Sequence, residues 1–264
     1  MTEPAHLVTL ELAVRIGGVQ VCRALDLDLA PGTCWALMGQ NGSGKTTLLH
    51  TLAGLRPATA GEIHLDGRAL PQWRRPDLAR RLGLLTQDFQ DPFPATVLDT
   101  ALLGRHPWLS LWQWEGPADL ARARAALKTV GLAEFEQRNI ATLSGGERRR
   151  LGIATLLTQD PAVLLLDEPA NHLDLRHRQQ ILATLAQLAH AQQRTVMMSL
   201  HDPALAWRFC DHALLLMGDG EVVAGETREV LNADNLTRLY DYPVACAQVG
   251  DERVFVVRQD AAHT

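Results

Sequence analysis

The chain has 264 residues, and 47% of them are hydrophobic, which is ordinary for a globular protein with a sizeable core. Its net charge of −5 and its pI near 6.0 provide no basic footprint for nucleic acid. We therefore expect one large domain, or one core with a small insert, and no nucleic-acid partner.

Cysteine spacing and the first residues indicate a reducing compartment. The cysteines form no Cys-x-x-Cys pair, so we expect neither a metal site nor disulfides. Residues 1–4 lack the basic start of a signal peptide, and no apolar run approaches the roughly 18 residues that span a bilayer. We expect a cytosolic protein that can reach a membrane through a partner. The cysteines are Cys22, Cys34, Cys210 and Cys246.

The N-terminal residues predict a pair of strands and then a buried strand. Leu7 to Val14 alternates loosely, Gly17-Gly18 marks a turn, and Val19 to Leu29 resumes the alternation. Pro31-Gly32 then leads into the apolar run Cys34 to Met38, which predicts a strand inside the core.

A Gly-rich loop with a lysine and a threonine follows this strand and opens a helix, Thr47 to Ala53. Its glycines let backbone N–H groups close around an anion, and the helix N-terminus adds partial positive charge. We expect Lys45 near the β- and γ-phosphates of a nucleotide and the Thr46 hydroxyl on Mg²⁺. A Gly-rich turn with a chance lysine is the alternative, which the strand–loop–helix context disfavours. The predicted nucleotide-binding residues are Gly39, Asn41, Gly42, Ser43, Gly44, Lys45, Thr46 and Thr47.

The middle of the chain changes from strands to helices. Strands are expected at 61–67 and 82–85, with a short helix at 76–81 between them. Thr96 should cap a helix that reaches Gly104, and Ala118 to Val130 predicts another. Ser144 and Glu147 form a capping box for a helix over 147–159. We interpret 89–155 as a helical insert in a core of 1–88 and 156–230, followed by a short tail, 231–264.

The second half of the core returns to buried strands. Ala162 to Leu166 is bounded by Pro161 and Asp167, which is typical of a strand buried on both faces. The other expected elements are a helix at 176–192, a strand at 195–200, a hairpin at 213–224 and one strand in the tail, at 253–257.

Two carboxylates, Asp167 and Glu168, end the strand Ala162 to Leu166. The carboxyl end of a parallel strand faces the ligand crevice of an α/β sheet. We therefore expect Asp167 to hold the Mg²⁺ shell and Glu168 to polarise an attacking water. The alternative is a solvated pair of carboxylates, which we would favour only without the phosphate loop.

Leu143 to Glu147 is a second Gly-rich helix start, with N–H groups free to bind an anion at Ser144, Gly145 and Gly146. An ordinary capped helix is the alternative. Because the chain has two such starts but one loop lysine, we infer that the second acts on a nucleotide held by another subunit of a dimer.

Together these motifs resemble the ATP-binding subunit of an ABC transporter, over roughly residues 7 to 230. The resemblance implies an α/β fold: a P-loop NTPase (RecA-like) core with an N-terminal antiparallel β subdomain and an inserted α-helical subdomain. The matching motifs, in order, are Gly39–Thr46, Gln87, Leu143–Glu147, Leu164–Glu168 and His201.

The resemblance also implies roles for single residues. Gln87 would sense Mg²⁺ and the γ-phosphate, His201 would hydrogen-bond the γ-phosphate, and Asp174 would support contact across the dimer. Taken alone, Gln87 is a surface glutamine, His201 a strand-end histidine and Asp174 a helix N-cap. The family's aromatic residue for stacking on adenine is missing near the first turn, where Arg15 or Ile16 could substitute.

Residues 78–82, 96–97 and 103–107 resemble importers of haem, iron–siderophore complexes and cobalamin, and Phe93-Pro94 leans towards haem. The resemblance implies an ATP hydrolase that uses ATP and Mg²⁺, forms a homodimer and lies peripherally on the cytoplasmic side of the inner membrane. Its partners would be membrane permease subunits, two in number, and indirectly a substrate-binding protein. An exporter subunit, a soluble ABC-type ATPase and a module without turnover are the competing classes, and Glu168 argues against the last.

A segment rich in proline and aromatic residues, Phe89 to Trp114, directly follows Gln87. Because tryptophan is enriched at the energetic centres of interfaces, we expect this segment to form the permease docking surface. For any one tryptophan, such as Trp108, packing inside the helical insert is an equally good alternative.

Overall fold

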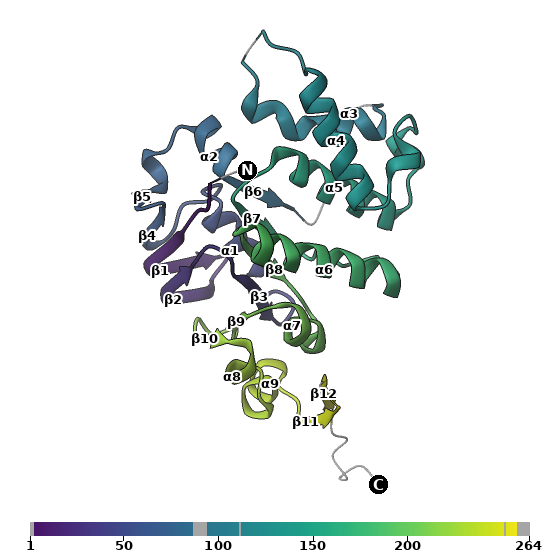
Figure 1. Ribbon diagram of the computed structural model, residues 1–264. Helices are drawn as coiled ribbons and strands as arrows, with labels where there is room; N and C mark the ends of the chain where they lie inside the picture. The colour runs from purple at the N-terminus through teal and green to yellow at the C-terminus, as the bar shows by residue number, and fades with distance from the viewer. Residues whose placement is uncertain (1–2, 87–93, 111, 251, 258–264) are drawn as a thin grey trace.

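The computed structural model describes residues 3–86, 94–110, 112–250 and 252–257 (Figure 1). Within these ranges the strands are β1 (Leu7–Ile16), β2 (Val19–Leu29), β3 (Cys34–Gly39), β4 (Ala60–Leu65), β5 (Arg68–Ala69), β6 (Leu82–Leu85), β7 (Val163–Leu166), β8 (Thr195–Ser199), β9 (His212–Leu216), β10 (Val222–Glu226), β11 (Val244–Val249) and β12 (Glu252–Val257). The α-helices are α1 (Lys45–Leu52), α2 (Arg75–Arg81), α3 (Val97–Leu102), α4 (Pro117–Thr129), α5 (Gly145–Gln159), α6 (Leu175–Gln192), α7 (Pro203–Phe209), α8 (Thr227–Val230) and α9 (Ala233–Tyr240).

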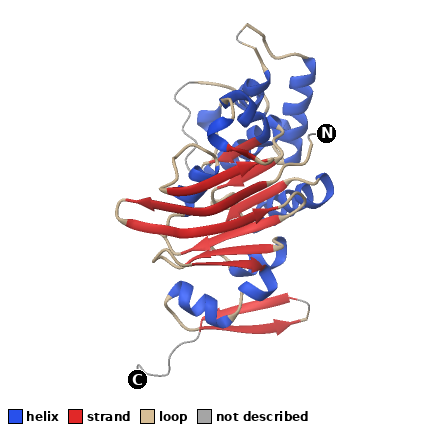
Figure 2. Cartoon of the chain, turned by 90° about the vertical axis from the view of Figure 1, so that its left-hand side faces the viewer, coloured by secondary structure: helices blue, strands red, loops and turns tan. Residues whose placement is uncertain are grey.

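A central sheet with the strand order β10-β9-β3-β8-β7-β6 organises the molecule. Its strands from β9 to β6 are parallel, and β10 returns antiparallel to β9 as the edge strand. A separate sheet, β2-β1-β4-β5, is antiparallel. Figure 2 shows these strands in a stack, with helices above and the β11–β12 hairpin below. The carboxyl ends of the parallel strands therefore share one edge, where ligands of α/β sheets bind.

Side chains of β3 alternate between two hydrophobic cores, and every residue of this strand is buried. Cys34, Ala36 and Met38 pack in the core that also holds helices α3 to α6. Trp35 and Leu37 pack in the core that holds α1 and the antiparallel sheet. Because successive side chains of a strand point to opposite faces, β3 contributes to a hydrophobic core on each side of the sheet. Burial on both faces is typical of a parallel strand.

Helices α3, α4 and α5 form the upper part of the molecule (Figure 1). The predicted caps are confirmed: the Thr96 side chain accepts from the Asp99 N–H, and Ser144 forms a capping box with Glu147. Because Gly145 already has helical geometry, α5 begins two residues before the predicted start. The division into core and insert stays a prediction, and a boundary at residue 155 would fall inside α5.

The C-terminal part is richer than the single strand that the sequence predicts. Asn232 caps α9 by accepting from the Asn235 N–H, and β11 pairs with β12 as an antiparallel hairpin. Phe255 on β12 lies edge-on to Trp207 of α7, with ring centroids 6.2 Å apart. The strand predicted at 253–257 is confirmed as β12, but the expectation that it is the single element of the tail was wrong, because it overlooked the cap of α9 and the pairing partner β11.

All four cysteines lie in the described residues and are free; Cys22, Cys34 and Cys210 are buried, and Cys246 is half-buried. Across the residues that the structure describes, no His, Cys, Asp and Glu side chains gather as a metal site. In the same residues, no helix combines the length and the apolar character needed to cross a bilayer.

Candidate functional site

The Gly-rich loop joins β3 to α1 at the carboxyl edge of the central sheet, as the sequence predicts. Gly44 caps α1 with a left-handed φ of 99°, and a Cβ at this position would collide with the Val21 side chain. Gly42 also has a positive φ, 82°. Glycine is therefore needed at both positions, because other residues adopt this backbone only with strain.

Lys45, the first residue of α1, is 7% exposed and folds back over the loop. Its ammonium donates to the carbonyl oxygens of Gly39 at 2.8 Å and Gln40 at 3.0 Å. Burial lowers the pKa of Lys45, while the nearby carboxylates of Glu168 and Asp167 act in the opposite direction. The carbonyl oxygens of the loop thus hold one charged donor in a fixed position.

Thr46 and Asp167 meet although 121 residues separate them in the sequence. The Thr46 hydroxyl donates to Asp167 Oδ2 at 2.5 Å, and the Ser199 hydroxyl on β8 donates to Oδ1 at 2.7 Å. Asp167 is 1% exposed. A hydroxyl and a carboxylate in contact are hard oxygen donors of the kind that Mg²⁺ prefers, so these residues fit the predicted metal.

Glu168 and His201 lie at the ends of the neighbouring strands β7 and β8. His201 Nε2 is 2.7 Å from Glu168 Oε1, and the Asn171 amide donates to Oε2 of the same carboxylate. Glu168 has a left-handed φ of 52°, and its N–H donates to the Ser199 hydroxyl at 2.7 Å. Both carboxylate oxygens are therefore oriented by neighbours, which is what a general base requires.

Arg149 of α5 is a residue of this site that the sequence reasoning did not single out. It is 7% exposed, and its guanidinium donates to the carbonyl oxygens of Thr86 at 2.6 Å, Glu168 at 3.1 Å and Asp167. Burial lowers its pKa. Arg149 thereby joins the helix of the second Gly-rich motif to the ends of β6 and β7.

The second Gly-rich motif and Asp174 line one hollow of about 490 Å³. One wall of the hollow is the start of α5, with Ser144, Gly145 and Gly146. The opposite wall is the start of α6, where Asp174 caps the helix by accepting a hydrogen bond from the His177 N–H. A Cβ on Gly146 would come 2.9 Å from the His172 carbonyl oxygen, so the two walls touch. Asp174 is therefore an N-cap, and this hollow is separate from Lys45 within one copy of the chain.

The other predicted residues lie outside the described residues or at the end of β1. Gln87 lies outside the described residues, and so does Phe93. Arg15 is exposed and Ile16 half-buried at the end of β1. Their part in binding a base stays a prediction.

The three tryptophans of the predicted docking segment differ in exposure. Trp108 is half-buried, and its indole N–H donates to the Gln159 carbonyl at 2.8 Å. The Arg105 and Arg80 guanidinium carbons lie 5.0 Å and 5.6 Å from its ring centroid. Trp112 and Trp114 are 94% and 86% exposed. Trp108 thus follows the packing alternative, whereas the other two are available to a partner.

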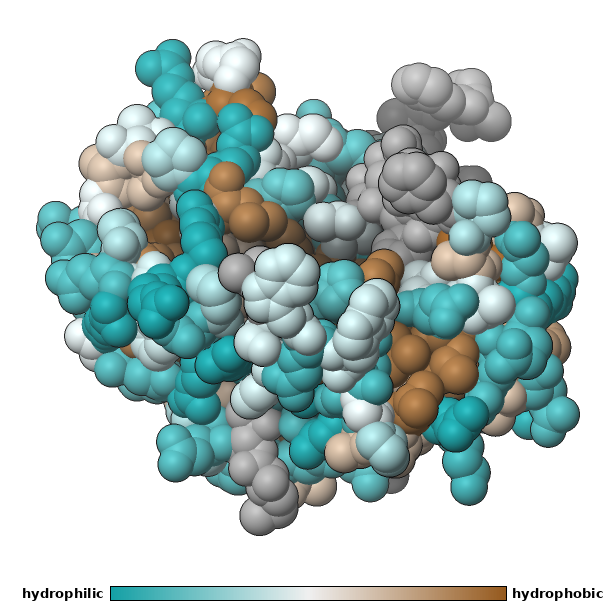
Figure 3. Space-filling model, turned by 90° about the horizontal axis from the view of Figure 1, so that it is seen from above, coloured by the Kyte–Doolittle hydropathy of each residue, from teal (hydrophilic) through white to brown (hydrophobic). Residues whose placement is uncertain are grey.

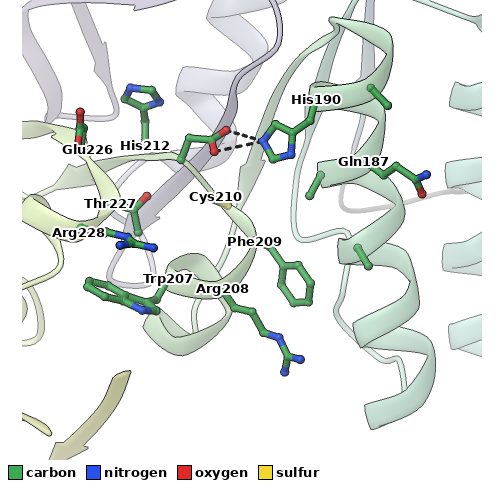
Figure 4. A pocket seen from close by; sticks show the side chains of 14 residues that line it. Gln187, His190, Trp207, Arg208, Phe209, Cys210, His212, Glu226, Thr227 and Arg228 are labelled. Atoms are coloured by element: carbon green, nitrogen blue, oxygen red, sulfur yellow. Dashed lines mark hydrogen bonds and ion pairs between the residues drawn. The ribbon is translucent and has the colours of Figure 1, made fainter. Parts of the chain in front are cut away.

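A different hollow, of about 730 Å³, opens between α6, α7 and the start of β9 (Figure 4). Two of its lining residues, His190 and Asp211, form an ion pair with a shortest distance of 2.9 Å. The hollow is at the amino ends of the parallel strands, because β9 begins at His212. It therefore lies at the edge of the sheet opposite the phosphate loop, and we do not assign it to the same chemistry.

Comparison with known proteins agrees with this geometry. The family model described as ABC transporter matches residues 22–171. The hemin import ATP-binding protein HmuV of Streptomyces coelicolor is 37% identical over 233 residues, which cover 88% of this chain and 82% of that protein. The petrobactin import ATP-binding protein FpuD of Bacillus anthracis is 36% identical over 229 residues, which cover 86% of this chain and 83% of that protein.

Solved structures give the same result. An ABC transporter of proposed metal-chelate type, in an inward-facing conformation, has a TM-score of 0.84 and 30% identity, covering 97% of this chain and 98% of that one. A dimeric ATP-binding cassette in a post-hydrolysis state, bound to ADP and Pi, has a TM-score of 0.73 and 26% identity, covering 84% of this chain and 99% of that one. The chain belongs to the ABC transporter family, as one of its ATP-binding and ATP-hydrolysing cassettes.

Proposed function

We propose that this cassette hydrolyses ATP with Glu168 as the general base and His201 as the group that orients it. The observation that carries the proposal is the convergence of residues from three strand ends on one edge of the sheet. Lys45 would hold the β- and γ-phosphates, and Glu168 would take a proton from the attacking water. The 2.7 Å contact between His201 Nε2 and Glu168 Oε1 supports the pairing.

Thr46 and Asp167 would hold Mg²⁺, since their oxygens are in contact and the carboxylate is buried. When bound, the metal neutralises charge on the phosphates. Ser199 and Arg149 keep the Asp167 side chain and backbone in place through the bonds described above. We retain Gln87 as a further predicted sensor of Mg²⁺, on sequence grounds.

We further propose a homodimer in which Ser144, Gly145 and Gly146 of one copy face the phosphate held by Lys45 of the other. The hollow at the start of α5 supports this arrangement, because a helix N-terminus lines it and the chain's own Lys45 is not among its lining residues. The dimeric cassette bound to ADP and Pi has the same fold. Asp174 would then serve both as the cap of α6 and as part of the subunit contact.

The transported molecule is proposed from the relatives, whose names specify import of hemin and petrobactin. We propose that the cassette powers uptake of haem or another iron or cobalt chelate, on the cytoplasmic side of the inner membrane. Its partners would be a pair of permease subunits and, indirectly, a substrate-binding protein, with no nucleic acid. A polytopic membrane protein that co-purifies with the chain would support this over a soluble ATPase, and the direction of ATP-dependent flux in vesicles would separate importer from exporter.

The exposed tryptophans support a permease contact beside the helical part of the molecule. Trp112 and Trp114 lie in the connection between Trp108 and α4, and both project into solvent. The face seen from above is mainly hydrophilic, with separate hydrophobic areas (Figure 3). Because exposed aromatic residues often anchor interfaces, we propose that the permease covers this region.

The central test is Glu168→Gln, which keeps the size and shape of the side chain but removes its basicity. ATP binding should persist, while kcat should fall by about 10²- to 10⁴-fold, the usual value of general-base assistance. Glu134→Gln is the control, because Glu134 is exposed on the 3₁₀ turn Ala133–Phe135. Turnover near the wild-type value in Glu168→Gln would rule out the assignment of the base.

A further inference from the structure

Helix α9 brings the C-terminal part of the chain onto the edge of the sheet that carries the site. Its last two residues contact the two loops that hold the reacting groups. The Gln40 side-chain amide of the phosphate loop donates to the Leu239 carbonyl at 2.9 Å. The Tyr240 hydroxyl donates to the His201 carbonyl at 3.1 Å. Adjacent residues of one helix thus connect the loop of Lys45 to the loop of His201.

The helix itself is firmly held against the sheet. Leu236 and Leu239 are 0% and 1% exposed, and they belong to the same hydrophobic core as Leu200, the residue before His201. On the outer side, an Arg238 nitrogen lies 2.7 Å from each carboxylate oxygen of Glu221. A helix of this length is marginal alone, so its position comes from these tertiary contacts.

The Tyr240 phenol is a donor over the whole working range of pH. Burial, with a contribution from the charge of Asp202, raises the pKa of Tyr240 to about 12. The hydroxyl therefore keeps its proton, and the His201 carbonyl has a constant partner. The imidazole of His201 is in turn 2.7 Å from Glu168.

We propose that α9 is a brace between the phosphate loop and His201, and that Tyr240 is a positioning residue for the His201–Glu168 pair. The inference rests on the proposed function, because it needs that pair to carry out hydrolysis. Without the phenol hydroxyl, the backbone of His201 loses its tether, and the imidazole and Glu168 spend less time in the productive arrangement. Nucleotide binding through Lys45 does not depend on this tether, so KM is preserved.

The first experiment measures steady-state ATP hydrolysis by the full-length chain carrying Tyr240→Phe. We expect kcat to fall about 3- to 10-fold, the effect of losing one hydrogen bond to a positioned group, with KM unchanged and Tm lowered by no more than a few degrees. Tyr242→Phe is the matched control, because the chain has two tyrosines and Tyr242 is 45% exposed. A Tyr240→Phe variant with wild-type kcat would overturn the proposal.

A double variant separates positioning from a general loss of structure. If Tyr240 acts through His201, adding Tyr240→Phe to His201→Ala should cause no further loss of kcat. An equal loss in both backgrounds would mean that Tyr240 acts independently of His201, and would refute the inference. Glu168→Gln tests the proposed function separately: if it abolishes turnover while Tyr240→Phe has no effect, only the brace is wrong.

Discussion

Replacing Arg149 by methionine tests how the ends of β6 and β7 are held together. Methionine matches the length and volume of the arginine stem but offers no donor. Three backbone carbonyls, those of Thr86, Asp167 and Glu168, would then lose a charged partner in a region where Arg149 itself is 7% exposed. The substitution therefore changes hydrogen bonding far more than packing.

The magnitude follows from two opposing contributions. A hydrogen bond to a charged group contributes about 1.5–3 kcal/mol, so three are worth roughly 5–9 kcal/mol. Removing the guanidinium also removes the free-energy cost of burying its charge, which offsets several kcal/mol of this loss. The same desolvation lowers the pKa of Arg149. We expect a net loss of about 2–4 kcal/mol in the free energy of unfolding. For a chain of this size, that corresponds to a fall in Tm of about 5–15 °C.

The assay is thermal unfolding followed by circular dichroism, with urea unfolding as a second measure of the same free energy. Arg148→Met is the matched control: the preceding arginine is half-buried, and the bond that it donates to the Ala141 carbonyl is long, at 3.4 Å. The control should lose less than about 1 kcal/mol. If Arg149→Met and Arg148→Met unfold at the same temperature, the three bonds contribute nothing net and the reasoning is refuted.

Three further predictions concern the dimer, acid stability and docking. Mixing a Lys45→Ala chain with a Ser144→Arg chain should restore part of the ATPase activity, because each heterodimer has one intact site; no recovery at any concentration would exclude site sharing. A hydrogen bond from the Gly116 N–H and the neighbouring Arg105 hold the pKa of Asp119 below its usual range. The contribution of this carboxylate to the free energy of unfolding is therefore complete above a pH of about 3.9, and it is lost as the pH falls through the folded-state pKa. Asp119→Asn should accordingly flatten the acid side of the stability–pH curve, and an unchanged curve would contradict this. Arginine substitutions at Trp112 and Trp114 should leave Tm unchanged but weaken co-purification with the permease, whereas normal assembly would place the docking surface elsewhere.

Elements with strong local signals could be predicted from the sequence. The bounds of β2, Val19–Leu29, match the prediction, because turn residues flank an alternating run. The Ser144 capping box could also be predicted, because its two residues have a fixed spacing in the sequence. Helix α9 was missed although Asn232 offers a cap, because the helix spans two turns and depends on contacts such as that between Gln40 and Leu239, 199 residues apart. A contact between residues so far apart cannot be predicted from a local sequence pattern.

Some residues of the site could also be predicted from the sequence, whereas others could not. Its predicted residues come together because each follows a strand of one parallel sheet, whose carboxyl ends share an edge. Arg149 could not be singled out, since it is the middle one of three consecutive arginines and only the rotation of α5 decides which of them reaches the ends of β6 and β7. Arg150 is also buried, but it donates to the carbonyl oxygens of Val130 and Gly131 instead. The direct contact of His201 with Glu168 was also beyond the sequence, which places the histidine near a phosphate only through resemblance. The predicted residues that come together lie at the start of α1, after the loop that follows β3, or just beyond β7 and β8: Lys45, Thr46, Asp167, Glu168 and His201.

The burial of the cysteines makes the chain convenient for site-specific labelling. Thiol reagents need a thiolate, and burial raises the pKa of Cys22 to about 11, while a hydrogen bond with Cys210 and burial raise that of Cys34. Cys210 is itself buried against Cys34, at a sulfur–sulfur distance of 3.9 Å. Cys246, on β11, is the partly exposed thiol that remains. A maleimide dye would therefore attach to the C-terminal hairpin of the unaltered sequence, and energy transfer between two labelled copies could follow their approach without any cysteine being replaced.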